Sequence, residues 1–156
     1  MPMIEFTYPK GAFSPEARKE LLEELATRLL KAERAPDTDF FRSITWVYAN
    51  EIDPENLVVG GRGDDTDPRF RVQVTVPEGA LSDSRKGELV AAVDEAVSEA
   101  AGLGDGDGLR VWTLIRDVPE GNWGAAGQQV RYQQLVEAAK AAREGADEAA
   151  VAVASG

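Results

Sequence analysis

The segment YPKGAFS at residues 8–14 returns 68 positions later as VPEGALS at residues 76–82, and this repeat decides the fold. Each copy follows a run in which every second residue is apolar, a pattern typical of a strand with one buried face. Each copy also ends in a serine, and a serine at this position caps the first turn of a helix. The alternating apolar residues are Ile4, Phe6 and Tyr8 before the first copy and Val72, Val74 and Val76 before the second.

The repeat continues beyond the two serines. Apolar residues at helical spacing follow each of them and predict one buried stripe per helix. The run SITWVYANEI at residues 43–52 then aligns with LRVWTLIRDV at residues 109–118, and a glycine-containing hairpin follows each run. A strand-helix-strand crossover of this length predicts parallel strands with right-handed winding.

The sequence therefore predicts an α+β (α/β) fold built from duplicated β-α-β units. We expect one domain over residues 2–144, with units at 2–61 and 69–127 and a C-terminal helix after them. The four strands form one sheet, and both helices cover the same face. Residues 145–156 are rich in Ala, Glu and Gly without a core pattern, so they are predicted to be a flexible tail.

Composition excludes several classes of chemistry. The 156 residues contain no cysteine and no histidine, which removes disulfides, thiolate nucleophiles, Cys or His metal sites and a Ser-His-Asp triad. A net charge of -11 argues against nucleic acid and anionic membranes as partners. The glycine-rich stretch at 102–108 is interpreted as a connection, and Asp64, Asp65 and Asp67 as part of a polar linker, so no metal site is predicted. We expect a cytoplasmic protein without cofactor.

Two features need another explanation. Pro2 stands directly before the first strand, and removal of Met1 would leave its secondary amine free at the edge of the sheet. An amino-terminal amine has a pKa of about 7.7–8.0, and burial in an apolar pocket lowers it toward neutrality, where it can move protons. Trp123 lies at the tip of the second hairpin, where its burial requires either a partner subunit or a ligand.

These features together resemble the tautomerase superfamily: an amino-terminal Pro2, a duplicated β-α-β unit, and the hairpin GNWGAAG at residues 121–127. The resemblance covers about residues 2–130 and is to two-unit members such as cis-3-chloroacrylic acid dehalogenase, malonate semialdehyde decarboxylase and fused 4-oxalocrotonate tautomerase. It implies a tautomerase/MIF-like fold, a homotrimer and Pro2 as the catalytic amine. The family's substrate-binding arginine positions are occupied here by Ala12, Ala80, Trp46 and Trp112.

The resemblance implies a tautomerase, an isomerase in which Pro2 is the general acid/base on a small enolisable keto or unsaturated carboxylic acid. Arg116 is the expected ligand of the substrate carboxylate, because antiparallel pairing of the two first strands would bring it near Pro2. Asn122, Trp123 and Tyr132 complete the expected binding site. Two alternatives stay open: dehalogenation, hydration or decarboxylation of a three-carbon acid on the same proline, and a non-catalytic trimer.

Overall fold

Each unit of the repeat folds as a strand, a helix and a second strand parallel to the first. The computed structural model describes residues 2–62 and 67–154, with side chains up to Gly145, so the predicted linker residues Asp64 and Asp65 lie outside the described part. The elements in chain order are β1 (Met3–Pro9), α1 (Pro15–Glu33), α2 (Asp39–Ser43), β2 (Trp46–Ile52), η1 (Pro54–Asn56), β3 (Phe70–Pro77), α3 (Asp83–Ala101), η2 (Gly108–Arg110), β4 (Val111–Val118), β5 (Gly124–Ala125), β6 (Gln128–Gln129) and α4 (Tyr132–Ala154).

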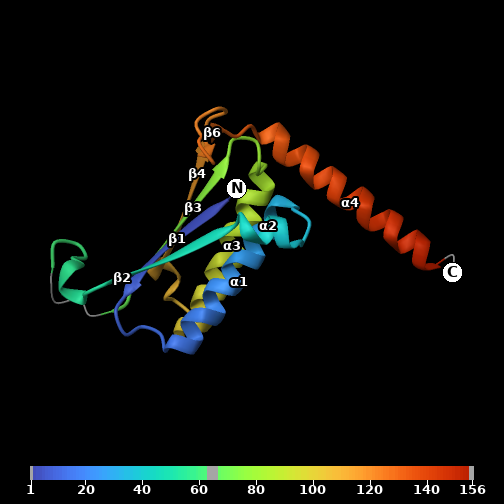
Figure 1. Ribbon diagram of the computed structural model, residues 1–156. Coiled ribbons are helices and arrows are strands. Elements are labelled where there is room, and N and C mark those ends of the chain that lie inside the picture. Colours follow the sequence, from blue (N-terminus) through green and yellow to red (C-terminus); the bar gives the residue numbers. More distant parts are fainter. Residues whose placement is uncertain (1, 63–66, 155–156) are drawn as a thin grey trace.

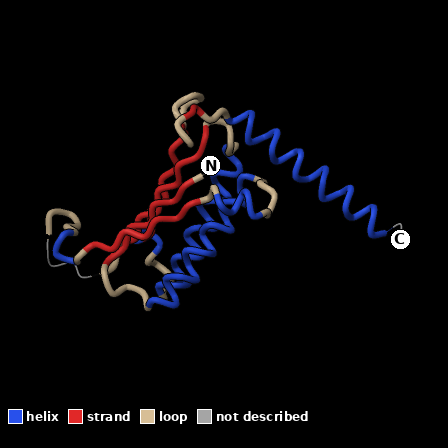
Figure 2. Tube along the Cα trace, viewed as in Figure 1, coloured by secondary structure: helices blue, strands red, loops and turns tan. Residues whose placement is uncertain are grey.

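The four long strands form one sheet in the order β2-β1-β3-β4. Strand β1 is parallel to β2, and β3 is parallel to β4, while β1 and β3 pair antiparallel in the centre. Helices α1 and α3 lie side by side on one face of this sheet (Figures 1 and 2). The predicted fold class, a four-stranded sheet with both unit helices on one face, is confirmed.

The alternating residues of the central strands make the core. Ile4 and Phe6 of β1 are fully buried, as are Val72 and Val74 of β3, because their side chains face the two helices. Helices α1 and α3 pack apolar stripes against these strands. Both helices are capped as the sequence predicts: the Ser14 hydroxyl accepts a hydrogen bond from the backbone N–H of Ala17, and Ser82 caps α3 in the same way. The buried helix residues are Leu21, Leu25, Leu29 and Leu30 of α1 and Leu89, Val93, Ala96 and Val97 of α3.

The structure differs from the sequence-based boundaries in three places. The second strand of the first unit begins at Trp46, because Ser43 is the last residue of the short helix α2 and Ile44 caps that helix. Its counterpart begins at Val111 after the 3-10 turn η2. Helix α4 runs to Ala154 and so enters the segment 145–156 that the sequence assigns to a tail; alanine, the best helix former, favours this. Flexibility of that segment stays a prediction.

Two surfaces of the described chain are left uncovered. The face of the sheet opposite α1 and α3 carries Trp46 and Trp112, whose side chains are 56% and 65% exposed. Helix α4 leaves the sheet beside the hairpin β5-β6 and projects away from the rest of the molecule (Figure 1). Within the described side chains, the contacts of α4 with the body of the protein come from its first half, up to Arg143.

Candidate functional site at the amino-terminal end of the sheet

Pro2 lies buried at the end of the sheet where the two units meet. Its backbone carbonyl accepts a hydrogen bond from the N–H of Trp46 at 3.2 Å, which fixes it against β2. On the other side Met3 pairs with Thr75 near the end of β3, so Pro2 stands next to the place where β3 and β4 both finish. The antiparallel pairing that the sequence argument required is present.

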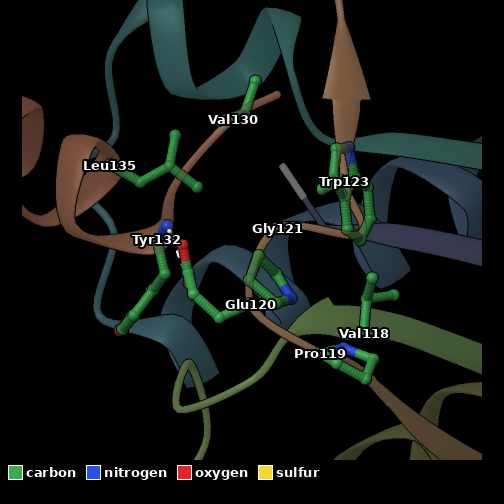
Figure 3. A pocket seen from close by; sticks show the side chains of 9 residues that line it. Val118, Pro119, Glu120, Gly121, Trp123, Val130, Tyr132 and Leu135 are labelled. Carbon is green, nitrogen blue, oxygen red and sulfur yellow. Dashed lines mark hydrogen bonds between the residues drawn. The ribbon is translucent and has the colours of Figure 1, made fainter. Parts of the chain in front are cut away.

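The second hairpin follows directly from this end of β4. The N–H of Asn122 closes a turn on the carbonyl of Pro119 at 2.9 Å, and the carbonyl of Trp123 accepts from the N–H of Val130 at 2.9 Å. Trp123 is half-buried and Asn122 is exposed. The Trp123 ring and the Val118 side chain line a small cavity of about 10 Å³, room for about one water molecule (Figure 3).

Tyr132 begins α4 and closes the site from another side. Its backbone N–H donates to the Glu120 carboxylate at 3.2 Å, a contact that ties the start of α4 to the hairpin (Figure 3). The ring packs over Gly79 in the turn after β3, where an added Cβ would lie 3.6 Å from a ring carbon. Burial raises the pKa of the Tyr132 hydroxyl above its usual value, the Glu33 charge raises it further, and Arg85 opposes both.

Glu33, the last residue of α1, belongs to this site although the sequence analysis does not single it out. Its side chain lines a cavity of about 180 Å³ together with Phe41, Ala80 and Tyr132. Burial raises the pKa of its carboxyl to about 7, while the positive charge of Arg85 acts to lower it. In the sequence Glu33 has the character of a solvated residue at the end of a charged helix. It is buried only because α4 packs against it. No local sequence signal marks it.

Arg85 of α3 holds the neighbouring backbone in place. One guanidinium nitrogen donates to the carbonyl of Ala80 at 2.9 Å and to the carbonyl of Ala32 at 3.3 Å. These contacts link the turn after β3 to the last turn of α1. The guanidinium therefore positions the backbone on both sides of the cavity and supplies a positive charge near Glu33.

Arg116 of β4 lies at the same end of the sheet as Pro2, with its side chain on the face away from α1 and α3. It pairs with Thr75, which in turn pairs with Met3, so it lies two strands away from β1, about 10 Å at ordinary strand spacing. Alternation turns its exposed side chain to the open face, whereas its neighbour Asp117 faces the helices and pairs with Lys86. The structure thus gathers Pro2, Trp123 and Tyr132 at one end, with Asn122 at the rim and Arg116 across the sheet.

Two other kinds of site are absent from the described residues. No cluster of three or more Asp or Glu side chains is arranged to hold a metal ion there. None of the helices in residues 2–62 and 67–154 combines the length and apolar character that crossing a bilayer requires.

Comparisons with known proteins agree with this architecture. The family model described as tautomerase enzyme matches residues 71–132, which run from β3 to the start of α4. No curated protein sequence is significantly similar to the chain. The similar solved structures include Pt0534 inactivated by 2-oxo-3-pentynoate, with TM-score 0.70 and 21% identity over 85% of this chain and 98% of that one.

Two further structures share the fold. A fused 4-OT symmetric trimer has TM-score 0.68 and 22% identity, covering 84% of this chain and 96% of that chain. N1, a member of the cis-3-chloroacrylic acid dehalogenase family, has TM-score 0.68 and 19% identity, covering 82% of each chain. The predicted resemblance is confirmed: the chain has the fold of the two-unit tautomerase superfamily, and its second unit carries the sequence pattern of that family.

Proposed function

We propose that the protein is a tautomerase-type enzyme in which the amine of Pro2 moves a proton between the oxygen and the carbon of a small enolisable keto or unsaturated carboxylic acid. The observation that carries the proposal is the burial of Pro2 at the junction of the two units, at the end of the sheet from which the hairpin of Trp123 continues. Burial disfavours the charged amine and so leaves a larger neutral fraction near pH 7. A neutral amine accepts the enol O–H proton, and the resulting ammonium returns a proton to carbon.

The other site residues receive roles in this proposal. Trp123 and Tyr132 exclude water from the Pro2 amine. Asn122 at the hairpin rim hydrogen-bonds the substrate. Arg116 binds the carboxylate, for which the planar guanidinium is suited. It sits at the same end of the sheet as Pro2, although on the open face.

Assembly belongs to the same proposal. The fused 4-OT structures of similar fold include a symmetric and an asymmetric trimer, and this chain leaves two tryptophans exposed on its open sheet face. We propose a homotrimer that covers this face. Location in the cytoplasm stays a prediction.

A second candidate is hydration, dehalogenation or decarboxylation of a three-carbon acid on the same proline. It is supported by the likeness in fold to N1, a member of the cis-3-chloroacrylic acid dehalogenase family. The two reactions respond oppositely to pH. Tautomerisation needs neutral Pro2, so kcat/KM rises with pH through the amine pKa, whereas chemistry on the protonated amine falls.

The first experiment is an intact mass measurement before and after exposure to 2-oxo-3-pentynoate, the compound that inactivates Pt0534. We expect a chain that lacks Met1 and gains one adduct, located on Pro2 by peptide mapping. Turnover is then assayed on a panel of enolised keto acids. A Pro2→Ala protein should fold normally and lose about 100-fold or more in kcat/KM, the range for loss of a general acid/base.

The same measurements can contradict the proposal. A retained Met1 would make Pro2 an amide without a basic nitrogen, and an unmodified chain would show that no reactive amine is accessible. Full activity in folded Pro2→Ala would assign the chemistry to another group. Absence of turnover across the panel, with the amine intact, would favour the non-catalytic trimer.

A further inference from the structure

A pocket of about 490 Å³ lies at the end of the sheet opposite to Pro2. The register places it there, because β1 and β2 finish together at Pro9 and Ile52, whereas Pro2 precedes the start of β1. Figure 1 shows the loop after β2 and the hairpin β5-β6 at opposite ends of the sheet. Small-molecule sites commonly have volumes of about 300–1,000 Å³, so this far-end pocket has the size of a ligand site. Its lining includes Ile52, Leu57, Val58, Arg71, Leu109 and Trp112.

The far-end pocket is the counterpart of the Pro2 site in the duplicated chain. At the 68-residue shift of the repeat, Phe70 takes the position of Pro2, and Phe70 lines this pocket. Leu57, in the loop after β2, likewise corresponds to Trp123 in the second hairpin. Phe70 lies inside the chain, so its nitrogen is a peptide nitrogen without basicity. The duplicated position can therefore hold a ligand but offers no amine for proton transfer.

Apolar side chains make one wall of the far-end pocket. Val58, Leu109 and Trp112 line it, and each of them is at least 60% exposed. Large apolar side chains that are exposed together in a hollow favour a partner that removes them from water. This wall therefore favours a ligand with an apolar body.

Arg71 of β3 supplies a cationic group to the same pocket. Its Nη2 donates to the Thr7 hydroxyl at 3.4 Å, across the pairing of β1 and β3. In residues 2–62 and 67–145 no carboxylate lies within ion-pair distance of its guanidinium. A guanidinium offers several N–H donors in one plane, and a carboxylate accepts two of them side by side. Arg71 is therefore available to a carboxylate from outside the chain.

The other charged groups near Arg71 are engaged within the protein. Arg110 pairs with the Asp67 carboxylate at 2.7 Å. Arg69 donates to the backbone carbonyl of Asp67 at 3.0 Å. Glu5, two residues before Thr7 on the same face of β1, accepts a hydrogen bond from Gln73 at 3.2 Å. These contacts leave the charge of Arg71 to be balanced by a ligand.

We propose that the far-end pocket binds a small organic acid with an apolar body, such as an aryl or branched aliphatic monocarboxylate. The guanidinium of Arg71 binds the carboxylate, and the wall of Val58, Leu109 and Trp112 covers the apolar body. The ligand is bound without reacting, because the pocket has no amine. The inference does not rest on the proposed activity of Pro2, which lies at the other end of the sheet.

The test is an NMR titration of the protein, in the assembly that it forms in solution, with phenylacetate. The three tryptophans report on different places: Trp112 lies in the far-end pocket, Trp123 in the second hairpin, and Trp46 at the start of β2. We expect the indole N–H signal of Trp112 to shift with saturation and that of Trp46 to stay in place. Phenylacetamide has a similar shape without the charge, so it should bind about tenfold more weakly or worse.

Arg71→Gln is the matched variant, and Arg62→Gln is its control. Both substitutions remove one exposed guanidinium, but Arg62 lies in the loop after β2 and does not line the pocket. The dissociation constant of phenylacetate, read from the Trp112 signal, should rise about tenfold or more in Arg71→Gln. It should stay unchanged in Arg62→Gln.

Equal dissociation constants in Arg71→Gln and Arg62→Gln would overturn the proposal. If Arg71→Gln does not fold, the wild type decides, and equal binding of phenylacetate and phenylacetamide would overturn it. A Trp112 signal that never shifts would also overturn it, as expected if a neighbouring copy of the chain fills the pocket. A shift confined to Trp123 would place the acid in the second hairpin instead. Saturation at Trp112 in a protein without turnover supports the far-end pocket and contradicts the tautomerase.

Discussion

At the scale of single residues, Gly121 has a backbone conformation in the second hairpin that favours glycine over other residues. Its backbone has φ of +88°, and an added Cβ would lie 2.6 Å from Nη1 of Arg131, whose guanidinium also hydrogen-bonds Gln129. A left-handed conformation costs an L-residue about 1–2 kcal/mol, and the contact with Arg131 adds to this. The guanidinium is the end of a flexible, half-exposed side chain and can move aside at the cost of its hydrogen bond to Gln129, so we expect Gly121→Ala to lower the free energy of unfolding by about 2 kcal/mol in urea titrations.

Gly127 provides the matched control for that substitution. It has φ of +75° in the same hairpin, but an added Cβ there would meet nothing within 4 Å. Gly127→Ala should therefore cost only the conformational part, about 1–2 kcal/mol. Equal losses in the two variants would show that the guanidinium of Arg131 moves aside without cost.

The carboxyl of Glu33 also makes stability depend on pH. Its pKa in the folded protein is about 7, above the ordinary 4.5, so folding favours the protonated form. This contribution is fully present below about pH 4.5 and is lost as the pH rises through about 7. Between about pH 5 and 8 the wild type should lose on the order of 2 kcal/mol of unfolding free energy relative to Glu33→Gln. Parallel curves for the two proteins in urea would contradict a buried carboxyl.

The sequence predicts the positions of some residues in the structure and misses others, for identifiable reasons. The sequence singles out Pro2 and Trp123 because a terminal proline and a hairpin aromatic have local signatures, and their roles in a site stay a proposal. Glu33 cannot, since its environment comes from α4, which begins about a hundred residues later. The orientation of Arg116 follows from strand register, and the sequence argument places it at the correct end without assigning its face.

At the scale of elements, α4 has two parts with different tasks. Its first turns cover the cavity through Tyr132, Leu135 and Ala139, while the segment from residue 145 on extends away from the body (Figure 1). Deletion of residues 145–156 should leave the free energy of unfolding within about 0.5 kcal/mol of the full chain, the usual range for changes remote from the core. Chemical denaturation followed by tryptophan fluorescence measures this.

Deletion from residue 132 is the contrasting variant. It removes the Tyr132 ring from Gly79 and opens the cavity that holds Glu33 to water. Loss of one large buried side chain alone costs about 2–5 kcal/mol, so this protein should be clearly less stable. Equal stability of the two shortened proteins would mean that α4 does not contribute to the fold.

The elements also show where periodicity is informative. Strict alternation and the 68-residue repeat predict β1, β3 and the two long helices, because each has one face against the same core. Helix α2 has only five residues, too few for a helical period, so no apolar pattern in the sequence marks it. The end of α4 differs in another way: its composition is compatible with either a helix or a tail, and apolar periodicity does not distinguish them.

At the scale of the whole molecule, the open sheet face carries large apolar side chains that nothing in the described chain covers. Trp112 is 65% exposed on this face, beside Arg71 of β3 in the strand register. If the proposed homotrimer covers this face, Trp112→Glu should shift the protein to smaller species in light scattering, because it places a charge in a desolvated contact. Val90→Glu, at an exposed apolar position on the outer side of α3, is the control and should leave assembly unchanged. A trimer that persists in Trp112→Glu would place the subunit contacts elsewhere.

The antiparallel seam between β1 and β3 has a consequence for how the protein is made. Each parallel pair can close within its own unit, since Met3 pairs with Trp46 and Phe70 with Val111. The seam instead joins Met3 of β1 to Thr75 of β3. It can form only after β3 has been synthesised, about seventy residues later. Non-local pairings of this kind carry the loop-closure entropy that slows folding. The end of the chain that is synthesised first is therefore among the last to be completed, and a nascent first unit exposes its edge until its duplicate arrives.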